Sequence, residues 1–424
     1  MIITLIIAFF ITLVFGFPIA YVIGFSTLVY TLVTGTLPDT LIPQRLFVGT
    51  DKFVLLAVPF FMLAGELMNA SQATKKLVNL ANAIVGHLRG GLAQVNIFVS
   101  MLFAGVTGAG TADTAAIGSL LIPAMVDEDY TPEYSAAVTA ASSVIGPIIP
   151  PSVSAVIFGV SAQVSVGAIL LAGAIPGLLL GLGQMAVVNY HARKYNFPKG
   201  EKSTLPEIGK AFKDALPPLL IPLVIIGGIV SGYFTPTEAA AIAVLVALVL
   251  GFVYKTIKLK DLSKLLLNTA ITSGSVMIIV GLASSFGWVL TIERIPHLVT
   301  TYLTTISQNP YLILILINIL LLFVGTFMET TASIIIMTPI LLPVVQQMGI
   351  DPIHFGAIMI VNLGIGLATP PLGLCLFIAS TISKASLEDI TKAIIGFLLV
   401  SSAVLLLITY YEPISMYLPN LLLK

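Results

Sequence analysis

Runs of about 20 apolar residues, the length that crosses a bilayer, recur from one end of this 424-residue chain to the other. Hydrocarbon offers no hydrogen-bond partners, so such a chain must satisfy its backbone within helices or a closed barrel. Continuous apolar runs of this length predict helices. Only 9% of the residues are charged, against about 25% in soluble domains. We therefore predict an all-α polytopic membrane protein.

The few reactive side chains exclude several classes of function. Cys375 is the single cysteine, so the chain has neither a disulfide framework nor a cysteine-ligated metal site. All four histidines fall near predicted span ends, which leaves no serine–histidine–aspartate relay at membrane depth. We therefore predict that the chain is not an enzyme. Its net charge of zero provides no basic surface for nucleic acid.

The distribution of lysine and arginine predicts the orientation in the membrane. The polar loop 191–214 carries six basic residues, and the positive-inside rule places it in the cytoplasm. With the crossings predicted below, 15 basic residues fall on that side, and the four on the opposite side are Arg45, Lys52, Arg294 and Lys424. Segments 71–91 and 295–308 are amphipathic and are predicted to lie along the membrane interfaces. The apolar stretch 1–25 is too long for the hydrophobic region of a signal peptide and lacks a basic start, so it is predicted to form the first spanning helix.

The second half of the chain repeats landmarks of the first at a spacing of 220 residues. Between 103–151 and 323–371, 12 of 49 aligned positions are identical, and half of the identities are glycine or proline. These residue types set backbone geometry rather than hydrophobicity, so a shared apolar composition does not explain the matches. The sequence therefore predicts an internal repeat.

Each repeat unit contains two apolar runs separated by a polar, glycine- or threonine-rich break. Each run has about 14 residues, which makes roughly 21 Å of helix, and a hydrocarbon core is about 30 Å thick. We therefore predict two re-entrant helical hairpins whose tips end inside the membrane. A spanning helix follows in each unit, broken by IGPIIPPS (145–152) or IGLATPPLG (365–373). Paired prolines there leave backbone carbonyls without partners.

The number of crossings between the hairpins predicts how the two units are oriented. The crossings are predicted at 132–163, 166–190, 214–233, 236–254 and 264–290. Because their number is odd, the hairpins enter from opposite faces, the first from the cytoplasm. An inverted repeat with unwound segments near the midplane is the architecture of secondary transporters.

Backbone carbonyls and hydroxyls converge where a hairpin tip meets an unwound helix, and such oxygens suit sodium, a hard cation. We predict two Na⁺ sites. The first comprises Gly105, Thr107, Gly108, Thr111, Ser142, Ser143, Gly146 and Pro150. The second comprises Gly325, Thr326, Thr330, Thr331, Asn362, Gly366, Thr369 and Pro370. The alternative is that these small residues only let helices pack closely.

Two acidic residues lie within a few positions of the predicted tips. Acids at membrane depth are functional candidates by default, and we place Asp113 and Glu329 close to the coupling ions or the substrate. Asp113 either ligates an ion or accepts backbone N–H groups at the start of the returning helix, as an N-terminal cap does. Glu329 acts similarly or carries a proton.

The motifs FAGVTGAGTADTAAIG and VGTFMETTASIIIMTPILLP, followed by GPIIPPS and GLATPPLG, resemble the large membrane subunit of TRAP (tripartite ATP-independent periplasmic) transporters. AVPFFMLAGELMNAS (57–71) extends the resemblance, which covers essentially the whole chain. It implies a multi-pass permease of the bacterial inner membrane, within the ion-transporter superfamily, that works by an elevator mechanism with Na⁺ coupling. It also implies a small membrane subunit, here expected as a separate chain, and a periplasmic binding protein. Family substrates are organic acids such as sialic acid and C4-dicarboxylates.

Two other transport functions stay open at this point. A stand-alone divalent-anion/sodium symporter would need no binding protein, and a passive channel would show no sodium dependence. The expected segments are scaffold helices with a cytoplasmic interfacial arm (1–91), a first transport repeat with a cytoplasm-facing hairpin (92–163), scaffold helices, loops and a periplasmic-side arm (164–309), a second transport repeat with a periplasm-facing hairpin (310–381), and a C-terminal spanning helix (382–424).

Overall fold

The computed structural model describes residues 2–35, 38, 40–71 and 73–423, apart from the side chains of residues 106, 107 and 304. In these residues all regular structure is helical, besides one isolated bridge between Arg89 and Lys199. The elements are α1 (Ile2–Val14), α2 (Ile19–Thr34), α3 (Leu41–Thr50), the 3₁₀-helix η1 (Phe53–Leu56), α4 (Ala57–Ala70), α5 (Ala73–Val85), α6 (Gly91–Thr107), α7 (Gly110–Asp127), α8 (Pro132–Ser143), α9 (Val153–Ala162), α10 (Val166–Lys194), α11 (Leu205–Val230), α12 (Pro236–Val253), α13 (Leu259–Ile292), α14 (Ile295–Ile306), α15 (Pro310–Phe327), α16 (Thr330–Gln347), α17 (Pro352–Gly366), α18 (Leu374–Ser383), α19 (Leu387–Tyr410) and α20 (Pro413–Leu422).

Eight helices in the described part of the chain are long and apolar enough to cross a membrane. They are α4 with η1, α10, α11, α12, α13, α15, α16 and α19. This confirms the predicted all-α polytopic fold. Many apolar side chains on these helices are exposed, as expected for surfaces that face lipid.

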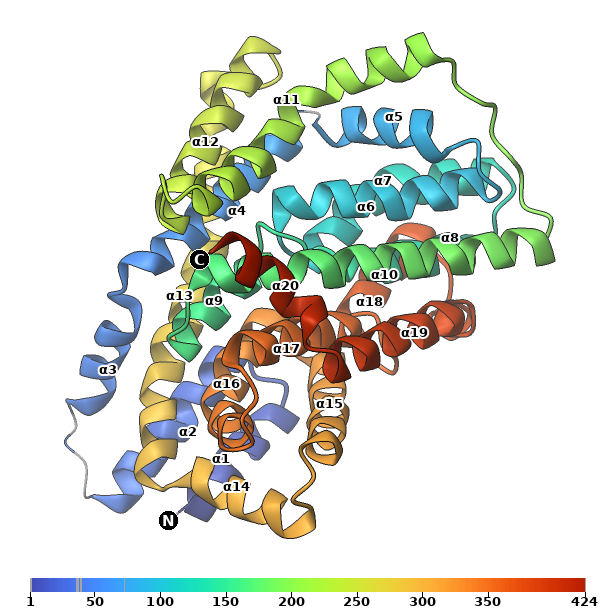
Figure 1. The fold of residues 1–424 in the computed structure, drawn as a ribbon. Helices are drawn as coiled ribbons and strands as arrows, with labels where there is room; N and C mark the ends of the chain where they lie inside the picture. The colour runs from blue at the N-terminus through green and yellow to red at the C-terminus, as the bar shows by residue number, and fades with distance from the viewer. Residues whose placement is uncertain (1, 36–37, 39, 72, 424) are drawn as a thin grey trace.

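The two repeat units form the centre of the molecule. In Figure 1 the first hairpin, α6 and α7, lies in the upper half of the view, and the second, α15 and α16, lies in the lower half. α7 packs on α8, and α15 packs on α17. Every residue of 134–143 in α8 and of 354–366 in α17 is buried. The broken helices therefore form the core, and the hairpins cover them.

The predicted helix breaks are present at the predicted places. α8 and α9 are separated at residues 144–152, and α17 and α18 at 367–373. The Pro150–Pro151 and Pro370–Pro371 peptide bonds are both cis. These pairs are 220 residues apart, so the structure has the same backbone form at equivalent repeat positions.

The prediction of a single first spanning helix at residues 1–25 is wrong. Gly16 has φ +75°, and Pro18 precedes α2. Glycine readily adopts this left-handed conformation, and proline removes a helical N–H donor. The chain therefore turns there, and α1 and α2 pack against each other.

The hairpin arms are longer than predicted. α6 has 17 residues, and α7, α15 and α16 have 18 each, which makes about 26 Å at 1.5 Å per residue. The glycine and threonine residues before each tip continue the helix, so the predicted unwound stretches were too wide. The hairpins are confirmed as helical pairs, and their re-entrant placement stays a prediction.

Segments predicted to share the cytoplasmic side meet in the structure. Gly90 N–H donates to the Pro198 carbonyl at 3.3 Å, beside the bridge between Arg89 and Lys199. The amphipathic segments form the short helices α5 and α14. Residues 382–424 hold the spanning helix α19 and a further helix, α20.

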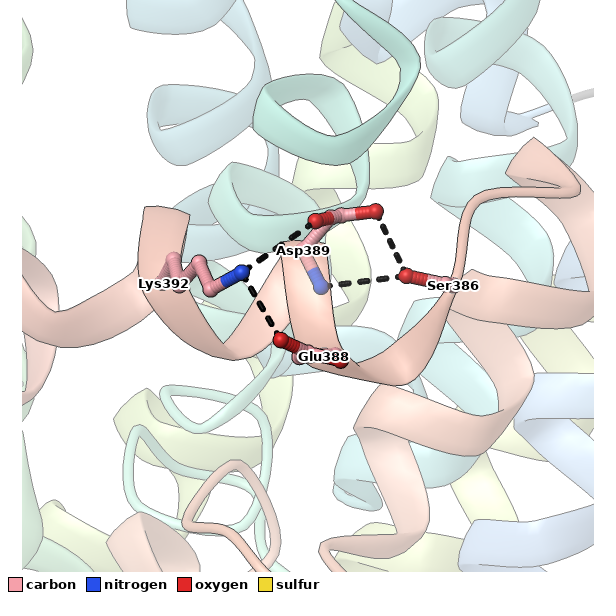
Figure 2. Close-up of polar contacts among 4 residues, drawn as sticks. All are labelled: Ser386, Glu388, Asp389 and Lys392. Atoms are coloured by element: carbon pink, nitrogen blue, oxygen red, sulfur yellow. Dashed lines mark hydrogen bonds and ion pairs between the residues drawn. The ribbon is translucent and has the colours of Figure 1, made fainter.

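The start of α19 has its own polar cluster (Figure 2). Ser386 Oγ accepts the Asp389 N–H at 3.2 Å and donates to the Asp389 carboxylate at 2.6 Å. Lys392 Nζ lies 2.9 Å from Glu388 and 3.7 Å from Asp389. These contacts cap the helix and keep Lys392 on its own element.

Candidate functional site

The tip of the first hairpin packs directly on the first helix break. The tip is the two-residue turn 108–109 between α6 and α7. Gly108 has φ +64°, and a Cβ there would lie 3.0 Å from the Pro151 carbonyl oxygen. A Cβ on Gly110 would lie 2.9 Å from the Ser143 carbonyl oxygen. Glycine is required because carbonyl groups of the break lie against the tip.

The second hairpin meets the second break in the same way. Its tip is the turn 328–329 between α15 and α16. A Cβ on Gly366 would lie 2.6 Å from the Gly325 Cα. The Gly373 N–H donates to the Thr326 carbonyl at 2.9 Å. Each hairpin therefore contacts its own broken helix through bare backbone, as the repeat register predicts.

Hydroxyl groups at the breaks direct their protons back into the helices. Ser143 Oγ donates to the Thr139 carbonyl at 2.7 Å, and Thr369 Oγ1 donates to the Ile365 carbonyl at 2.8 Å. Because the proton is used in this way, the oxygen lone pairs stay available to a cation. Thr330 Oγ1 is buried at the second tip and has no hydrogen-bond partner among the described residues.

Two equivalent residues, Ser142 and Asn362, face the hairpins' first arms rather than the tips. Ser142 Oγ accepts from Ser100 Oγ at 2.9 Å and donates to Asn96 Oδ1 at 3.1 Å. Asn362 Nδ2 donates to Asn318 Oδ1 at 2.8 Å. Both residues therefore fix a hairpin arm to its broken helix. The Asn362 Oδ1 atom is buried and has no partner within the part of the chain that the structure describes.

The two acidic residues occupy different positions. Glu329 is the N-cap of α16, and its carboxylate accepts the N–H groups of Thr331 at 2.8 Å and Ala332 at 3.3 Å. Asp113 is fully buried in the first turn of α7 and is not its N-cap, which is Ala109. A Cβ on Gly146 would lie 2.2 Å from Asp113 Oδ2, so this carboxylate touches the first break.

A cavity of about 480 Å³ lies between the two tips and brings both repeat units together. The predicted residues that line it are Gly108, Thr111, Glu329 and Thr331. Its other walls come from the α1–α2 connection, from Met62 on α4, from Val153 on α9 and from α13. No lysine, arginine or histidine is among the described residues that line this cavity.

The other predicted residues lie behind the cavity. Besides Gly108, contacts between tip and break are made by Gly105, Ser143, Gly146 and Pro150 in the first unit, and by Gly325, Thr326 and Gly366 in the second. Thr369 lies in the second break, and its hydroxyl bonds within its own helix. Ser142 and Asn362 face the first arms, and Pro370 precedes a cis bond. The Thr107 side chain lies outside the described residues.

Thr272 and Ser275 on α13 line the cavity and were not predicted. Their spacing of three residues puts them on one helical face. A polar face within NTAITSGSVMIIVG was therefore visible in the sequence. The approach of the α1–α2 turn, through Phe17 and Pro18, had no comparable signal.

The donor set fits a hard monovalent cation. In the ranges that the structure describes, no group of three or more histidine, cysteine, aspartate or glutamate side chains is close enough to hold a metal ion. The oxygens at the two tips are backbone carbonyls, hydroxyls and a lone carboxylate in each unit. Such ligands suit sodium and do not suit the transition metals, which prefer imidazole or thiolate.

Paired hairpins and broken helices around a shared cavity define the chain as a membrane transporter. The family model "Tripartite ATP-independent periplasmic transporter, DctM component" matches residues 6–414, and the chain belongs to this family. It is therefore a transport component, not an enzyme, and a multi-pass protein of the bacterial inner membrane.

Named relatives agree with this family. The chain is 41% identical to the sialic acid TRAP transporter large permease protein SiaM of Vibrio cholerae, over 96% of each chain. It is 37% identical to the C4-dicarboxylate TRAP transporter large permease protein DctM of Rhodobacter capsulatus, again over 96% of each. The YdaH transporter of Alcanivorax borkumensis shares the fold, with a TM-score of 0.67 and 14% identity over 88% of this chain and 87% of that one.

Proposed function

We propose that this chain is the large permease of a sodium-coupled transporter that imports an organic acid anion delivered by a periplasmic binding protein. The observation that carries this proposal is the cavity lined by both hairpin tips. A substrate held there contacts both repeat units at once, so any change at either tip affects its binding. Coupling between ion and substrate requires such a shared boundary.

Sodium is proposed because of the oxygen atoms behind each tip. Carbonyls of an unwound helix, hydroxyls with free lone pairs and one carboxylate supply the ligand types that hard cations take. Thr330 and Thr369 contribute hydroxyl oxygens at the second tip. The first unit has the Ser143 hydroxyl and the Asp113 carboxylate close to its tip and break, at positions that differ from those in the second unit.

An organic acid is proposed because two features favour an anion in the cavity. These are the helix ends that lie at the cavity and the coupled ions. α7 begins at Gly110 and α16 at Thr330, so the N-termini of both helices lie at the cavity. Helix N-termini carry partial positive charge. The named relatives transport sialic acid and C4-dicarboxylates, and we propose a carboxylate substrate of that kind.

The proposed movement is an elevator. The transport part comprises residues 92–163 and 310–381, and it moves against a scaffold formed by residues 1–91 and 164–309. The proposed partners are a small membrane subunit on a separate chain and a periplasmic binding protein. Support comes from the match to nearly the full length of proteins named large permease. That tripartite family does not favour the stand-alone symporter.

Uptake into proteoliposomes that contain this chain and its small subunit, with binding protein outside, tests the proposal. We expect uptake to require an inward sodium gradient and the binding protein. Thr369→Val removes one hydroxyl oxygen, so the half-saturating sodium concentration should rise about tenfold, roughly 1.4 kcal/mol. Thr369→Leu should abolish uptake while the protein still folds.

The matched control for this test is Thr381→Val. Thr381 Oγ1 donates to the Phe377 carbonyl at 2.9 Å, the same type of bond that Thr369 makes, but it lies on an exposed face of α18. Its replacement should leave sodium activation unchanged. Wild-type sodium activation in Thr369→Val, or full uptake without sodium, would overturn the proposal.

A further inference from the structure

A second large cavity, of about 670 Å³, lies away from the hairpin tips, on the side that the charge distribution assigns to the cytoplasm. Three segments form it: the α7–α8 turn with the start of α8, the end of α10 with the residues that follow, and the first three turns of α19. Asp129 and Tyr195 on its wall are exposed, so the cavity opens at the molecular surface. We call it the α10 pocket.

Four aromatic rings that line the α10 pocket contact one another in a closed circuit. The centroid of the Tyr134 ring lies 4.8 Å from that of Phe197 and 5.7 Å from that of His191. The Tyr195 ring lies 5.8 Å from each of the same two rings. Faces of tyrosine and phenylalanine attract cations, and groups of such rings form binding sites for organic ammonium ligands.

The charges of the α10 pocket also favour a cation. Asp129 and Glu133 line the pocket. The ion pairs of the described chain all belong to Lys392 (Figure 2), so neither carboxylate has a described basic group within 4.0 Å. Lys392 lines the pocket as well, but its ammonium lies 2.9 Å from Glu388 and 3.7 Å from Asp389. The pocket therefore presents two uncompensated carboxylates beside its aromatic rings.

Two enclosed polar atoms of residues that line the α10 pocket lack hydrogen-bond partners. Tyr134 is only 6% exposed, and its hydroxyl has no partner among the described residues. The same holds for His191 Nδ1. A phenol oxygen accepts hydrogen bonds, and so does one nitrogen of a neutral imidazole. Because buried polar groups are normally paired, a ligand that donates N–H groups fits this pocket better than one that does not.

We propose that the α10 pocket binds an organic ammonium group that carries N–H donors, supplied by an aminolipid headgroup or by a soluble polyamine. The ammonium lies against the rings of Tyr134, Tyr195 and Phe197, and its charge is balanced by Asp129 and Glu133. A quaternary ammonium has the same charge but no N–H group, so it leaves the Tyr134 hydroxyl without a partner. The site lies outside the central cavity, and the proposal does not depend on the proposed function.

The acidic residues have an alternative role in stabilising α8. Glu133 lies in the first turn of this helix, where a negative charge interacts favourably with the helix N-terminus. A role of that kind affects the stability of the protein and not its affinity for amines. The test therefore measures affinity directly.

A tryptophan reporter in the α10 pocket measures binding. Tyr195→Trp keeps an aromatic face at an exposed position of the pocket, and Trp288→Phe removes the single native tryptophan. The full chain is placed in nanodiscs of phosphatidylcholine, a quaternary lipid without N–H donors. One series replaces increasing fractions of this lipid by phosphatidylethanolamine, and a second series adds spermidine to the solution. We expect a saturable change in tryptophan emission in at least one series, and the series that responds identifies the source of the amine.

Charge variants test whether the carboxylates hold the amine. Asp129→Asn and Glu133→Gln should each raise the apparent Kd about fivefold, the effect of one unit charge at about 4 Å in water. Asparagine tolerates the left-handed backbone of Asp129, which has φ +64°. Asp214→Asn is the control, since it removes an exposed charge outside the pocket, and it should leave the Kd unchanged. No saturable response in either series, or equal affinities in the pocket variants and the reporter protein, would overturn the proposal.

Tyr134→Phe separates ligand binding from folding. Because the hydroxyl has no described partner in the protein, its removal should not lower the midpoint of thermal unfolding in pure phosphatidylcholine. The same change should raise the Kd for the amine about fivefold, since one hydrogen bond to the ligand is lost. Unchanged affinity in Tyr134→Phe would overturn the assignment of an N–H donor. These measurements need neither sodium nor a binding protein, so their outcome is independent of the proposed transport function.

Discussion

Gly366 and Gly325 show how single residues control the second tip. Their backbones touch, and a Cβ on Gly366 would lie 2.6 Å from the Cα and the carbonyl carbon of Gly325. Neither atom can move like the end of a flexible side chain. Any side chain here therefore forces the hairpin away from the broken helix.

Gly366→Ala should abolish sodium-driven uptake and lower the free energy of unfolding by about 1–3 kcal/mol, the usual cost of overpacking. Gly274→Ala is the matched control, since no atom lies within 4 Å of a Cβ at that helical position. Alanine there should be neutral or slightly stabilising. Thermal denaturation in detergent and uptake in proteoliposomes give the two readouts, and wild-type uptake in Gly366→Ala would contradict the expected contact.

At the scale of elements, Asn318 links three helices. Its Nδ2 donates to Thr409 Oγ1 on α19 at 3.0 Å, and its Oδ1 accepts from Asn362 on α17 at 2.8 Å. Asn318 itself belongs to α15, the first arm of the second hairpin. The three side chains are buried, so each bond replaces one that water would otherwise make.

Asn318→Leu should lower the free energy of unfolding by about 1–3 kcal/mol, because it removes the buried side-chain bonds to both Asn362 and Thr409 and leaves Asn362 Nδ2 only its bond to the residue 318 carbonyl. Thr409→Val removes only the second of these bonds and should cost less. Chemical denaturation of the purified protein in detergent measures both. Equal stability of Asn318→Leu and the wild type would show that the bonds are not formed.

Several elements were predictable because local chemistry decides them. α8 begins at Pro132 after Thr131, and α17 begins at Pro352 after Asp351, whose side chains accept N–H groups of the first turn. A capping residue followed by proline is a strong start signal. The helix breaks followed from paired prolines for the same reason.

Other features depend on packing and were not predictable. Glycine and threonine before the tips weaken a helix only slightly, and Gly105, where a Cβ would lie 3.4 Å from the Pro150 carbonyl oxygen of the break, stays within α6. The tip-to-break contacts of the candidate site followed from the repeat. The shared cavity did not, because it needs α13 and the Phe17–Pro18 turn to approach from distant parts of the chain. The Gly16 and Pro18 signals for that turn were present in an otherwise continuous apolar run.

At the scale of the whole molecule, the odd number of crossings between the hairpins decides the orientation of each loop. Cysteines introduced at Lys202 and Arg294 test it, since both positions are exposed and Cys375 is fully buried. A membrane-impermeant maleimide should label Lys202→Cys only in inside-out vesicles and Arg294→Cys only in right-side-out vesicles. The wild-type protein should stay unlabelled in both. Labelling of the two variants from one face would contradict the inverted repeat.

The absence of a basic side chain among the described residues of the central cavity has a further consequence under the proposed coupling. Glu329, the only acidic residue among the described residues of its lining, repels a carboxylate when it is ionised. An acid molecule is then retained mainly while positive ions accompany it. Once those ions escape into the sodium-poor cell interior, only the partial charges of the two helix N-termini still attract the cargo, so loss of the ions promotes unloading.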